Sequence, residues 1–93
     1  MRLDVFLKES RLIKRRAWAK AACEAGRIMV GGAVAKAGRE VRVGDRIQLD
    51  LGKRRLIVEV AALPRDNVSK HEASRLYVVL SEERIAGIYD EFD

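Results

Sequence analysis

Cysteine and histidine are nearly missing from this chain of 93 residues, which contains only Cys23 and His71. A single cysteine excludes a disulfide within the chain, and one cysteine with one histidine cannot supply the four ligands of a structural zinc site. The sequence also lacks a Walker loop, a dinucleotide-binding fingerprint and a nucleophile elbow. We therefore expect no metal, no cofactor and no enzymatic activity, because a catalytic site needs a nucleophile, a base or a metal in a pocket.

Long hydrophobic runs are absent as well. Asp4 and Lys8 interrupt the first apolar positions, and no later apolar run has the length of a signal peptide or a membrane-spanning helix. A content of 48% hydrophobic and 35% charged residues is typical of a globular domain and not of a disordered tail. We expect a single domain, residues 1–93, that is soluble and cytoplasmic and has no membrane partner.

Acidic residues are scarce in the first half of the chain. Residues 1–55 contain fifteen Lys and Arg against six Asp and Glu, a net charge of +9, whereas the remaining residues contain four against eight, a net charge of −4. Concentrated positive charge attracts polyanions, and each phosphate that it neutralises releases counterions and so adds affinity. The asymmetry predicts a nucleic-acid-binding protein. Charge alone leaves open a module that binds acidic proteins or lipid head groups.

Two short helices are predicted before residue 26. Apolar residues at helical spacing indicate a helix from about Asp4 to Ser10, with Asp4 as its cap or in its first turn. An alanine-rich stretch indicates a second helix from about Arg15 to Ala25, ended by Gly26. Small residues share one face of this second helix, where another element can pack closely. They are Ala19, Ala22 and Cys23.

After residue 26 the hydrophobic pattern changes from helical spacing to alternation. Strands are predicted at residues 27–30, 33–35, 47–51, 56–60 and 76–80. Gly31-Gly32 suits a two-residue turn between the first two strands, because both positions tolerate positive φ. Ser69 followed by Glu72 resembles a capping box and predicts a helical turn near residues 70–75. The predicted fold class is α+β, with an N-terminal helical hairpin followed by a small, mostly antiparallel β-sheet.

A run of basic residues lies at the corner of the predicted hairpin, and no acidic residue occurs between Arg11 and Lys20. Uncompensated charge favours phosphate binding over the alternative, a merely solvated helix face. Arg16 is notable because a guanidinium can donate to two phosphate oxygens at once. The candidate RNA-binding residues are Arg2, Lys8, Arg11, Lys14, Arg15, Arg16, Lys20 and Arg27. For Arg27 the pattern leaves open whether it extends this surface or only neutralises the negative end of the second helix.

Two further features have alternative interpretations. Trp18 could stack on a base, but on a helix margin next to Ala22 a partly buried side chain that fills the core is the favoured interpretation. The run Lys53-Arg54-Arg55 is predicted to be a solvent-facing turn, with a weaker phosphate contact as the alternative.

Four motifs in the first 51 residues resemble those of a known family. They are Arg2-Leu-Asp-Val-Phe-Leu-Lys8, Ser10-Arg-Leu-Ile-Lys-Arg-Arg16-Ala17, Gly26-Arg-Ile-Met-Val-Gly-Gly32 and Val43-Gly-Asp45. In this order and at these spacings the chain resembles the S4 RNA-binding domain, which is named after a small-subunit ribosomal protein. Gly31 stands where the family usually has Asn, and Arg15 stands where it usually has Ser, which exchanges a helix cap for a charge. The resemblance implies the S4 fold and binding to structured RNA.

A later motif makes the resemblance more specific. Together with the first two motifs, Glu72-Ala-x-x-Leu-Tyr-x-x-Leu80 is similar to the RqcP family of ribosome quality-control factors, relatives of the heat-shock protein 15 family. This resemblance implies binding to large ribosomal subunits obstructed by peptidyl-tRNA, through large-subunit rRNA and the tRNA. We expect the protein to be a monomer. It also implies support for C-terminal alanine tailing of stalled chains by a partner protein. The alternatives are a ribosome-recycling factor of the heat-shock protein 15 type and a general rRNA-binding assembly protein.

The rest of the chain is expected to be mainly structural. Residues 1–51 are assigned to the S4 motif, residues 52–88 to a part that completes the sheet, and residues 89–93 to a frayed acidic tail. The apolar run at residues 76–80 is expected to be buried and to complete the core at about 25 cal/mol per Å² of apolar surface. Specificity for the obstructed subunit is then expected to reside in the basic N-terminal face.

Overall fold

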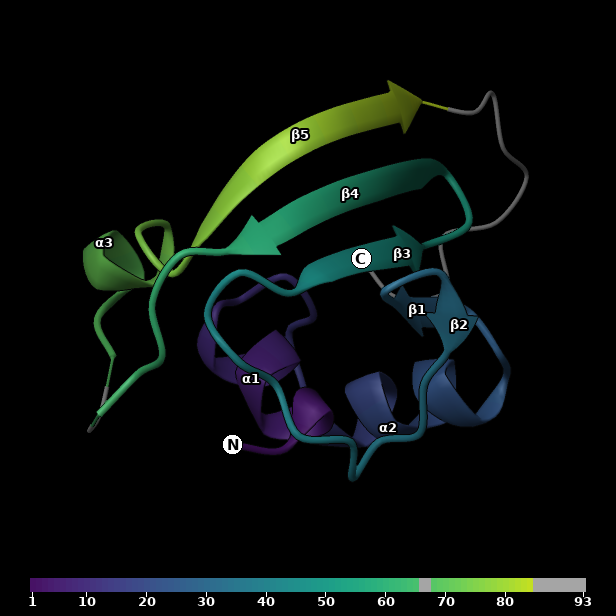
Figure 1. Ribbon diagram of the computed structural model, residues 1–93, viewed down its shortest axis with the longest axis horizontal. Coiled ribbons are helices and arrows are strands. Elements are labelled where there is room, and N and C mark those ends of the chain that lie inside the picture. Colours follow the sequence, from purple (N-terminus) through teal and green to yellow (C-terminus); the bar gives the residue numbers. More distant parts are fainter. Residues whose placement is uncertain (66–67, 85–93) are drawn as a thin grey trace.

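The structure is a computed structural model that describes residues 1–65 and 68–84 of the chain. The predicted order of two helices followed by a sheet is confirmed (Figure 1). In chain order, the elements are α1 (Leu3–Glu9), α2 (Arg16–Glu24), β1 (Ile28–Val30), β2 (Ala33–Val34), β3 (Arg46–Asp50), β4 (Arg54–Val60), α3 (Lys70–Ala73) and β5 (Tyr77–Arg84). None of the helices in the described part has the length and hydropathy needed to cross a membrane.

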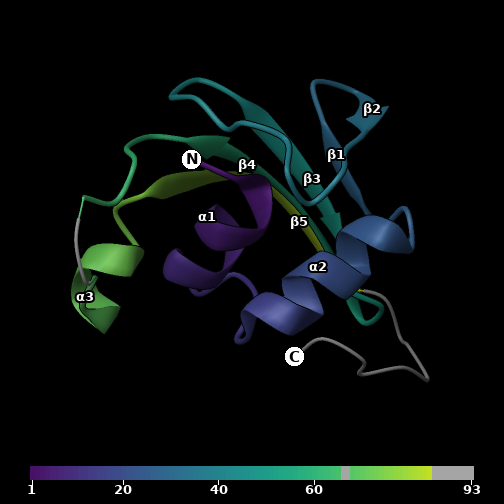
Figure 2. The same cartoon turned by 90° about the horizontal axis from the view of Figure 1, so that it is seen from below.

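The strands form one sheet in the order β2-β1-β3-β4-β5, and every described pairing is antiparallel. The turn between β1 and β2 is formed by Gly31 and Gly32, whose φ angles of +60° and +85° confirm the predicted two-residue turn. Helices α1 and α2 lie together against one face of this sheet (Figures 1 and 2). The opposite face of the sheet is left without a helix among the described residues.

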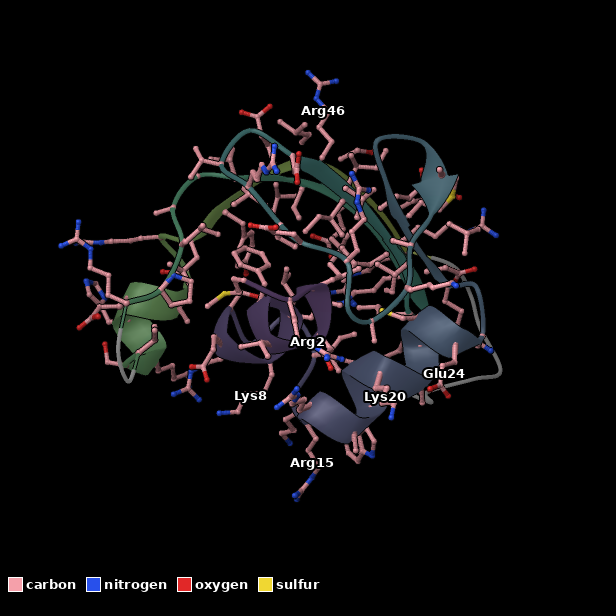
Figure 3. The ribbon with its side chains drawn as sticks, turned by 60° about the horizontal axis from the view of Figure 1, so that its bottom comes forward. Arg2, Lys8, Arg15, Lys20, Glu24 and Arg46 are labelled. Carbon is pink, nitrogen blue, oxygen red and sulfur yellow. The ribbon has the colours of Figure 1, made fainter. Side chains whose placement is uncertain are left out.

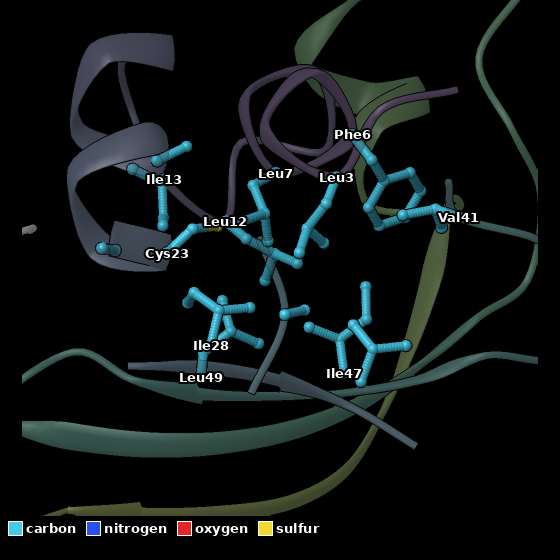
Figure 4. Packing of buried hydrophobic residues seen from close by; sticks show 14 of the residues in the cluster. Leu3, Phe6, Leu7, Leu12, Ile13, Cys23, Ile28, Val41, Ile47 and Leu49 are labelled. Carbon is cyan, nitrogen blue, oxygen red and sulfur yellow. The ribbon is translucent and has the colours of Figure 1, made fainter. Parts of the chain in front are cut away.

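The hydrophobic core lies between the helix pair and the sheet (Figure 4). Leu3, Phe6 and Leu7 of α1 are fully buried, as predicted from their helical spacing. The face of α2 that consists of small residues, Ala19, Ala22 and Cys23, is buried too, as expected for close packing. The strands contribute Ile28, Ile47, Leu49, Leu56, Val58 and Val60. Because the inner sides of both helices are fixed in this core, the positions of their outward side chains are fixed as well.

The end of α2 explains how the chain passes from helix to strand. The Gly26 amide donates to the Cys23 carbonyl at 3.0 Å, and the Arg27 amide donates to the Ala22 carbonyl at 3.0 Å. With Gly26 at φ +75°, these two bonds form a Schellman motif that satisfies carbonyls at the helix end. The motif sends the chain back toward the sheet and places Arg27 immediately before β1.

The prediction that the last strand buries its apolar run is wrong for most of that run. Leu76 is buried and Tyr77 packs against the core, but the side chains of Val78, Val79 and Leu80 are 54%, 46% and 46% exposed. The reason is position, since β5 is an edge strand that lies beyond the two helices (Figure 1). The predicted acidic tail at 89–93 and the last residues of the sheet-completing part, 85–88, lie outside the described residues.

Candidate nucleic-acid interface

Seven of the eight predicted RNA-binding residues lie on the helix layer or at its ends, and all seven are exposed. We call this set the basic helical face; it consists of Arg2, Lys8, Arg11, Lys14, Arg15, Arg16 and Lys20. Figure 3 shows labelled members of the set projecting from the helices, on the side of the molecule opposite to Arg46 of β3. The structure thus brings together side chains that the sequence places on α1, on α2 and on the connection between them.

Arg27 does not belong to this face. It follows the end of α2 at Glu24, so it lies beyond the helix that carries Arg16 and Lys20. Its side chain is only partly exposed, and its backbone completes the Schellman motif. Both roles considered for Arg27, a phosphate contact and neutralisation of the helix end, stay predictions.

A buried carboxylate joins two arginines of the basic helical face. Asp4 is 1% exposed and accepts hydrogen bonds from Arg2 Nε at 3.1 Å, Arg2 Nη2 at 3.3 Å and Arg16 Nε at 3.3 Å. The side chains of Arg2 and Arg16 remain 52% and 57% exposed. A guanidinium has five N–H donors, so each arginine keeps donors that Asp4 does not use. We call this arrangement the Arg2–Asp4–Arg16 cluster.

The charge state of Asp4 follows from its surroundings. Burial alone would raise the pKa of Asp4, but hydrogen bonds from Arg2 and Arg16 and their positive charges outweigh burial and hold the pKa below its ordinary value of 3.8. The carboxylate is therefore ionised at neutral pH and fixes the orientation of both guanidinium groups. Two pre-oriented, half-exposed guanidinium groups suit phosphate oxygens, which they can bind without first losing much side-chain freedom.

The cluster was missed from the sequence, although one signal for it exists. Asp4 lies in the first turn of α1, one of the two positions predicted, and its Oδ1 accepts from the Val5 amide at 2.9 Å, while Arg2 occupies the N-cap position. It occupies the buried side of α1 between Leu3 and Phe6. A carboxylate on the apolar side of a helix needs a cationic partner, so its position could have suggested one.

Arg2 is held by its backbone as well as by Asp4. Residue 2 forms an isolated antiparallel bridge with Glu40. The Leu3 amide donates to the Arg39 carbonyl at 2.8 Å, and the Val41 amide donates to the Met1 carbonyl at 2.8 Å. The start of the chain is thus tied to the segment between β2 and β3, which orders a residue that would otherwise be a loose terminus.

Arg15 and Trp18 interact at the start of α2. The Arg15 guanidinium lies 5.5 Å from the centre of the Trp18 ring, within cation–π distance. Trp18 is partly buried and packs against the core, which confirms the favoured interpretation. Arg15 occupies the N-cap position of α2 without a side-chain cap bond, as expected where the family usually has Ser. The Trp18 ring thereby orients the charge of Arg15.

The corner between the two helices has an unusual backbone. Arg11 has φ +61°, the only positive φ at a non-glycine residue in the described part of the chain. The left-handed region costs an L-residue about 1–2 kcal/mol. Buried Ser10 stabilises the corner, since its hydroxyl donates to the Leu7 carbonyl at 3.2 Å and accepts from the Leu12 amide at 3.5 Å. The Arg11 side chain also donates to the Val68 carbonyl at 3.4 Å, a contact with a residue 57 positions later in the chain.

Cys23 has the properties of a small buried hydrophobic residue. Burial, followed by the charges of Asp4 and Glu24, raises the pKa of its thiol to about 11, so the thiol stays protonated and weakly nucleophilic at neutral pH. Within residues 1–65 and 68–84, no group of His, Cys, Asp and Glu side chains is placed to hold a metal ion.

Comparison with known proteins places this geometry in a family. Residues 1–47 match the S4 domain model. The RQC P-site tRNA stabilizing factor of Halalkalibacterium halodurans is 52% identical over 86 residues, covering 92% of this chain and 97% of the relative. The chain belongs to this family, RqcP. The member from Bacillus subtilis is 45% identical over 85 residues, covering 91% and 98% of the two chains.

A solved structure confirms the fold. Heat-shock protein 15 of Vibrio cholerae, described as trimeric, superposes with a TM-score of 0.81 at 27% identity, covering 87% of this chain and 82% of that one. The predicted S4 fold and the predicted similarity to both RqcP and heat-shock protein 15 are therefore confirmed.

Proposed function

We propose that this protein is a non-enzymatic, RNA-binding factor of ribosome-associated quality control that acts in the cytoplasm on large ribosomal subunits obstructed by peptidyl-tRNA. Membership of the RqcP family and the S4 domain support RNA binding and a role in quality control. The name of the relatives, P-site tRNA stabilizing factor, supports a tRNA as one of the bound RNAs. The observation that carries the proposal is the Arg2–Asp4–Arg16 cluster within an exposed basic surface.

The basic helical face would bind mainly through phosphates. Arg2 and Arg16 would each direct remaining N–H donors to phosphate oxygens, whereas the lysines would act as mobile point charges. Contacts of this kind position a protein on RNA without reading bases, so shape and the spacing of phosphates would select the target. Affinity should then fall steeply with salt, because each contact releases bound counterions.

Selection of the obstructed subunit would come from two RNAs that are held at a fixed spacing. A face with few contacts binds one RNA weakly, but a second contact made within the same complex raises the overall affinity through effective concentration. We propose that large-subunit rRNA supplies one set of phosphates and peptidyl-tRNA the other. Bound in this way, the protein would hold the tRNA while a partner protein adds the alanine tail to the stalled chain.

Pelleting with purified large subunits tests the proposal. Wild-type protein, the variant Arg16→Ala and the control Arg46→Ala are sedimented at matched salt with empty subunits and with subunits that hold peptidyl-tRNA. We expect stronger binding of wild type and Arg46→Ala to the obstructed subunits, and weaker binding of Arg16→Ala to both. Equal binding of wild type to both particles would contradict the quality-control role and leave a general rRNA-binding protein.

A further inference from the structure

A hollow of about 360 Å³ lies where the corner between α1 and α2 meets the segment that leads into α3. Its lining consists of Lys8, Glu9, Arg11, Lys14, Val68 and Lys70. We propose that this hollow is a second phosphate-binding site, which takes a phosphodiester group of the RNA backbone and uses Lys70 from the C-terminal half as one of its ligands. The inference rests on the proposed function, since it concerns the RNA that the basic helical face binds.

The charge of the hollow is suited to an anion. Four cationic side chains line it against one carboxylate, that of Glu9. Lys8 Nζ lies 3.4 Å from Glu9 Oε1, so this carboxylate pairs with one of the four cations. The pair is partly exposed and therefore weak. Among the described lining residues, three positive charges therefore exceed the single carboxylate of Glu9. Like charges held close together repel one another, and a bound phosphate would remove that repulsion.

The backbone at the hollow is fixed in a costly conformation. Arg11 takes its left-handed φ at this place, and its Nη2 donates to the Val68 carbonyl, which is another lining residue. Strained residues persist where the surrounding structure determines them, and they gather at ligand-binding sites. The bond between Arg11 and Val68 joins positions that are 57 residues apart and brings the start of α3 to the corner. Ser69 Oγ accepts from the Glu72 amide at 3.1 Å, which holds the turn that carries Lys70.

The hollow and the Arg2–Asp4–Arg16 cluster are separate positions for phosphate. Lys8 lies in the last turn of α1, whereas Asp4 lies in the first turn. Four residues of helix separate their backbones by about 6 Å, and none of Arg2, Asp4 and Arg16 lines the hollow. Because the two sites share no residue, we expect an RNA on this face to place a different phosphate in each. Lys70 then makes the C-terminal half part of the interface.

The lining favours RNA over an acidic protein segment. Among the described residues that line the hollow, Val68 is the only apolar one and none is aromatic. Protein partners are usually anchored by aromatic or apolar side chains in dry pockets, which this lining does not offer. Clustered Lys and Arg around an open concave surface are typical of phosphate contacts.

The test measures binding of the full-length chain to large subunits that hold peptidyl-tRNA, over a series of salt concentrations. The variants are Lys70→Ala, the charge-preserving Lys70→Arg and the control Arg75→Ala, which removes a nearby exposed charge that does not line the hollow. We expect Lys70→Ala to lose roughly three- to tenfold in affinity and to reduce the log–log salt slope by about 0.7–0.9, the change for one phosphate contact. Lys70→Arg and Arg75→Ala should bind within about twofold of wild type if one charge at position 70 is what matters.

The outcomes separate this inference from the proposed function. If Arg16→Ala weakens binding while Lys70→Ala retains wild-type affinity and salt slope, the hollow is not a phosphate site and the proposed function stands. If wild type does not bind the subunits, both ideas are wrong. A loss in Lys70→Ala for whole subunits, but not for protein-free RNA extracted from the same particles, would assign the hollow to a ribosomal protein and overturn the phosphate assignment.

Discussion

The basic helical face and the sheet contain the same kinds of charged residues but pair them differently. On the sheet, Arg46 lies opposite Glu59 in the register of β3 and β4, with Nε and Oε1 3.6 Å apart, and Arg54 Nη1 lies 3.7 Å from Glu82 Oε2. On the helices, one buried carboxylate serves two arginines, and residues 10–23 contain no acid at all. These two arginines of the sheet are therefore each matched by an acid, whereas basic residues of the helices are in excess over acidic ones.

The difference concerns order as well as charge. An exposed cross-strand ion pair is held loosely and contributes about 0–1 kcal/mol to stability. Asp4 is ionised and buried, so its two arginines are needed both for folding and for orientation of the surface. In the proposed function, the buried carboxylate would make the positive surface suited to binding, because it fixes the orientation of two of its guanidinium groups. The following changes should break or sharpen this contrast.

The largest effect is expected from the double variant Arg2→Ala/Arg16→Ala. It leaves the Asp4 carboxylate without its cationic partners, which should lower the free energy of unfolding by about 1–3 kcal/mol. The loss is smaller than for a fully buried pair, because the side chains of Arg2 and Arg16 are half-exposed and their truncation lets water reach the carboxylate. Loss of two charged phosphate contacts, at about 1.5 kcal/mol or more each, should weaken binding to obstructed large subunits by about 10²-fold or more. Chemical denaturation measures the first effect, and pelleting measures the second.

Adding Asp4→Asn to this double variant separates folding from binding. The neutral amide removes the unpaired buried charge, so the triple variant should recover much of the lost stability. It should still bind as weakly as the double variant, because both guanidinium groups are gone. A triple variant that binds like wild type would show that Arg2 and Arg16 act only through folding.

The contribution of the Asp4 carboxylate to stability should depend on pH. Because Arg2 and Arg16 lower the pKa of Asp4 in the folded state below 3.8, the stabilising contribution of its ionised form is complete above that pH and is lost as pH falls through the folded-state pKa. Asp4→Asn should therefore be less stable than wild type at neutral pH, and the difference should shrink as the solution becomes strongly acidic. Urea denaturation at a series of pH values checks this, and a difference that stays constant with pH would contradict it.

A smaller effect, of opposite sign, is expected at the helical corner. Relative to Arg11→Ala, which also removes the side-chain bond to the Val68 carbonyl, Arg11→Gly should raise the free energy of unfolding by about 0.5 kcal/mol. The reason is that relief of about 1–2 kcal/mol of left-handed strain exceeds the entropic cost of glycine, about 0.5–1 kcal/mol. The control Ala21→Gly, at an exposed position within α2, should lower it by about 1 kcal/mol. Thermal unfolding compares the two. If both variants are destabilised equally, the backbone of Arg11 is not strained.

Much of the fold could be predicted because local patterns decide it. Helical spacing predicted α1, the alternation of apolar residues predicted β3 and β4, and Gly31-Gly32 predicted the turn of the first hairpin. The exposure of residues 78–80 could not be predicted from the local pattern, because an edge strand and a central strand can contain the same apolar residues. What decides between them is the extent of the helix layer, a property of the whole fold.

For the candidate site too, features set by neighbouring residues could be predicted, and features set by tertiary packing could not. The basic residues of the corner were visible because they are neighbours in the sequence. The pairing of Asp4 with Arg16 spans 12 positions, and the approach of Lys70 to Arg11 depends on where α3 docks. Neither follows from periodicity, since both depend on tertiary packing. Charge patterns therefore predicted the surface, and only the structure showed which members are anchored and which distant residue joins them.

The smallest effect is expected on the sheet. The side chains of Arg46 and Glu59 are 69% and 42% exposed, so water and salt screen the pair, and each long side chain loses freedom when it is held. Arg46→Ala and Glu59→Ala should each change the free energy of unfolding by less than about 0.5 kcal/mol, and a double-mutant cycle should give a coupling energy of similar size. Binding of Arg46→Ala to obstructed subunits should stay within about twofold of wild type, because its charge is already matched by Glu59 and lies on the face opposite to the helices. A tenfold loss of binding in Arg46→Ala would mean that the sheet also contacts RNA, and that pairing within the protein does not decide which basic residues are available to a ligand.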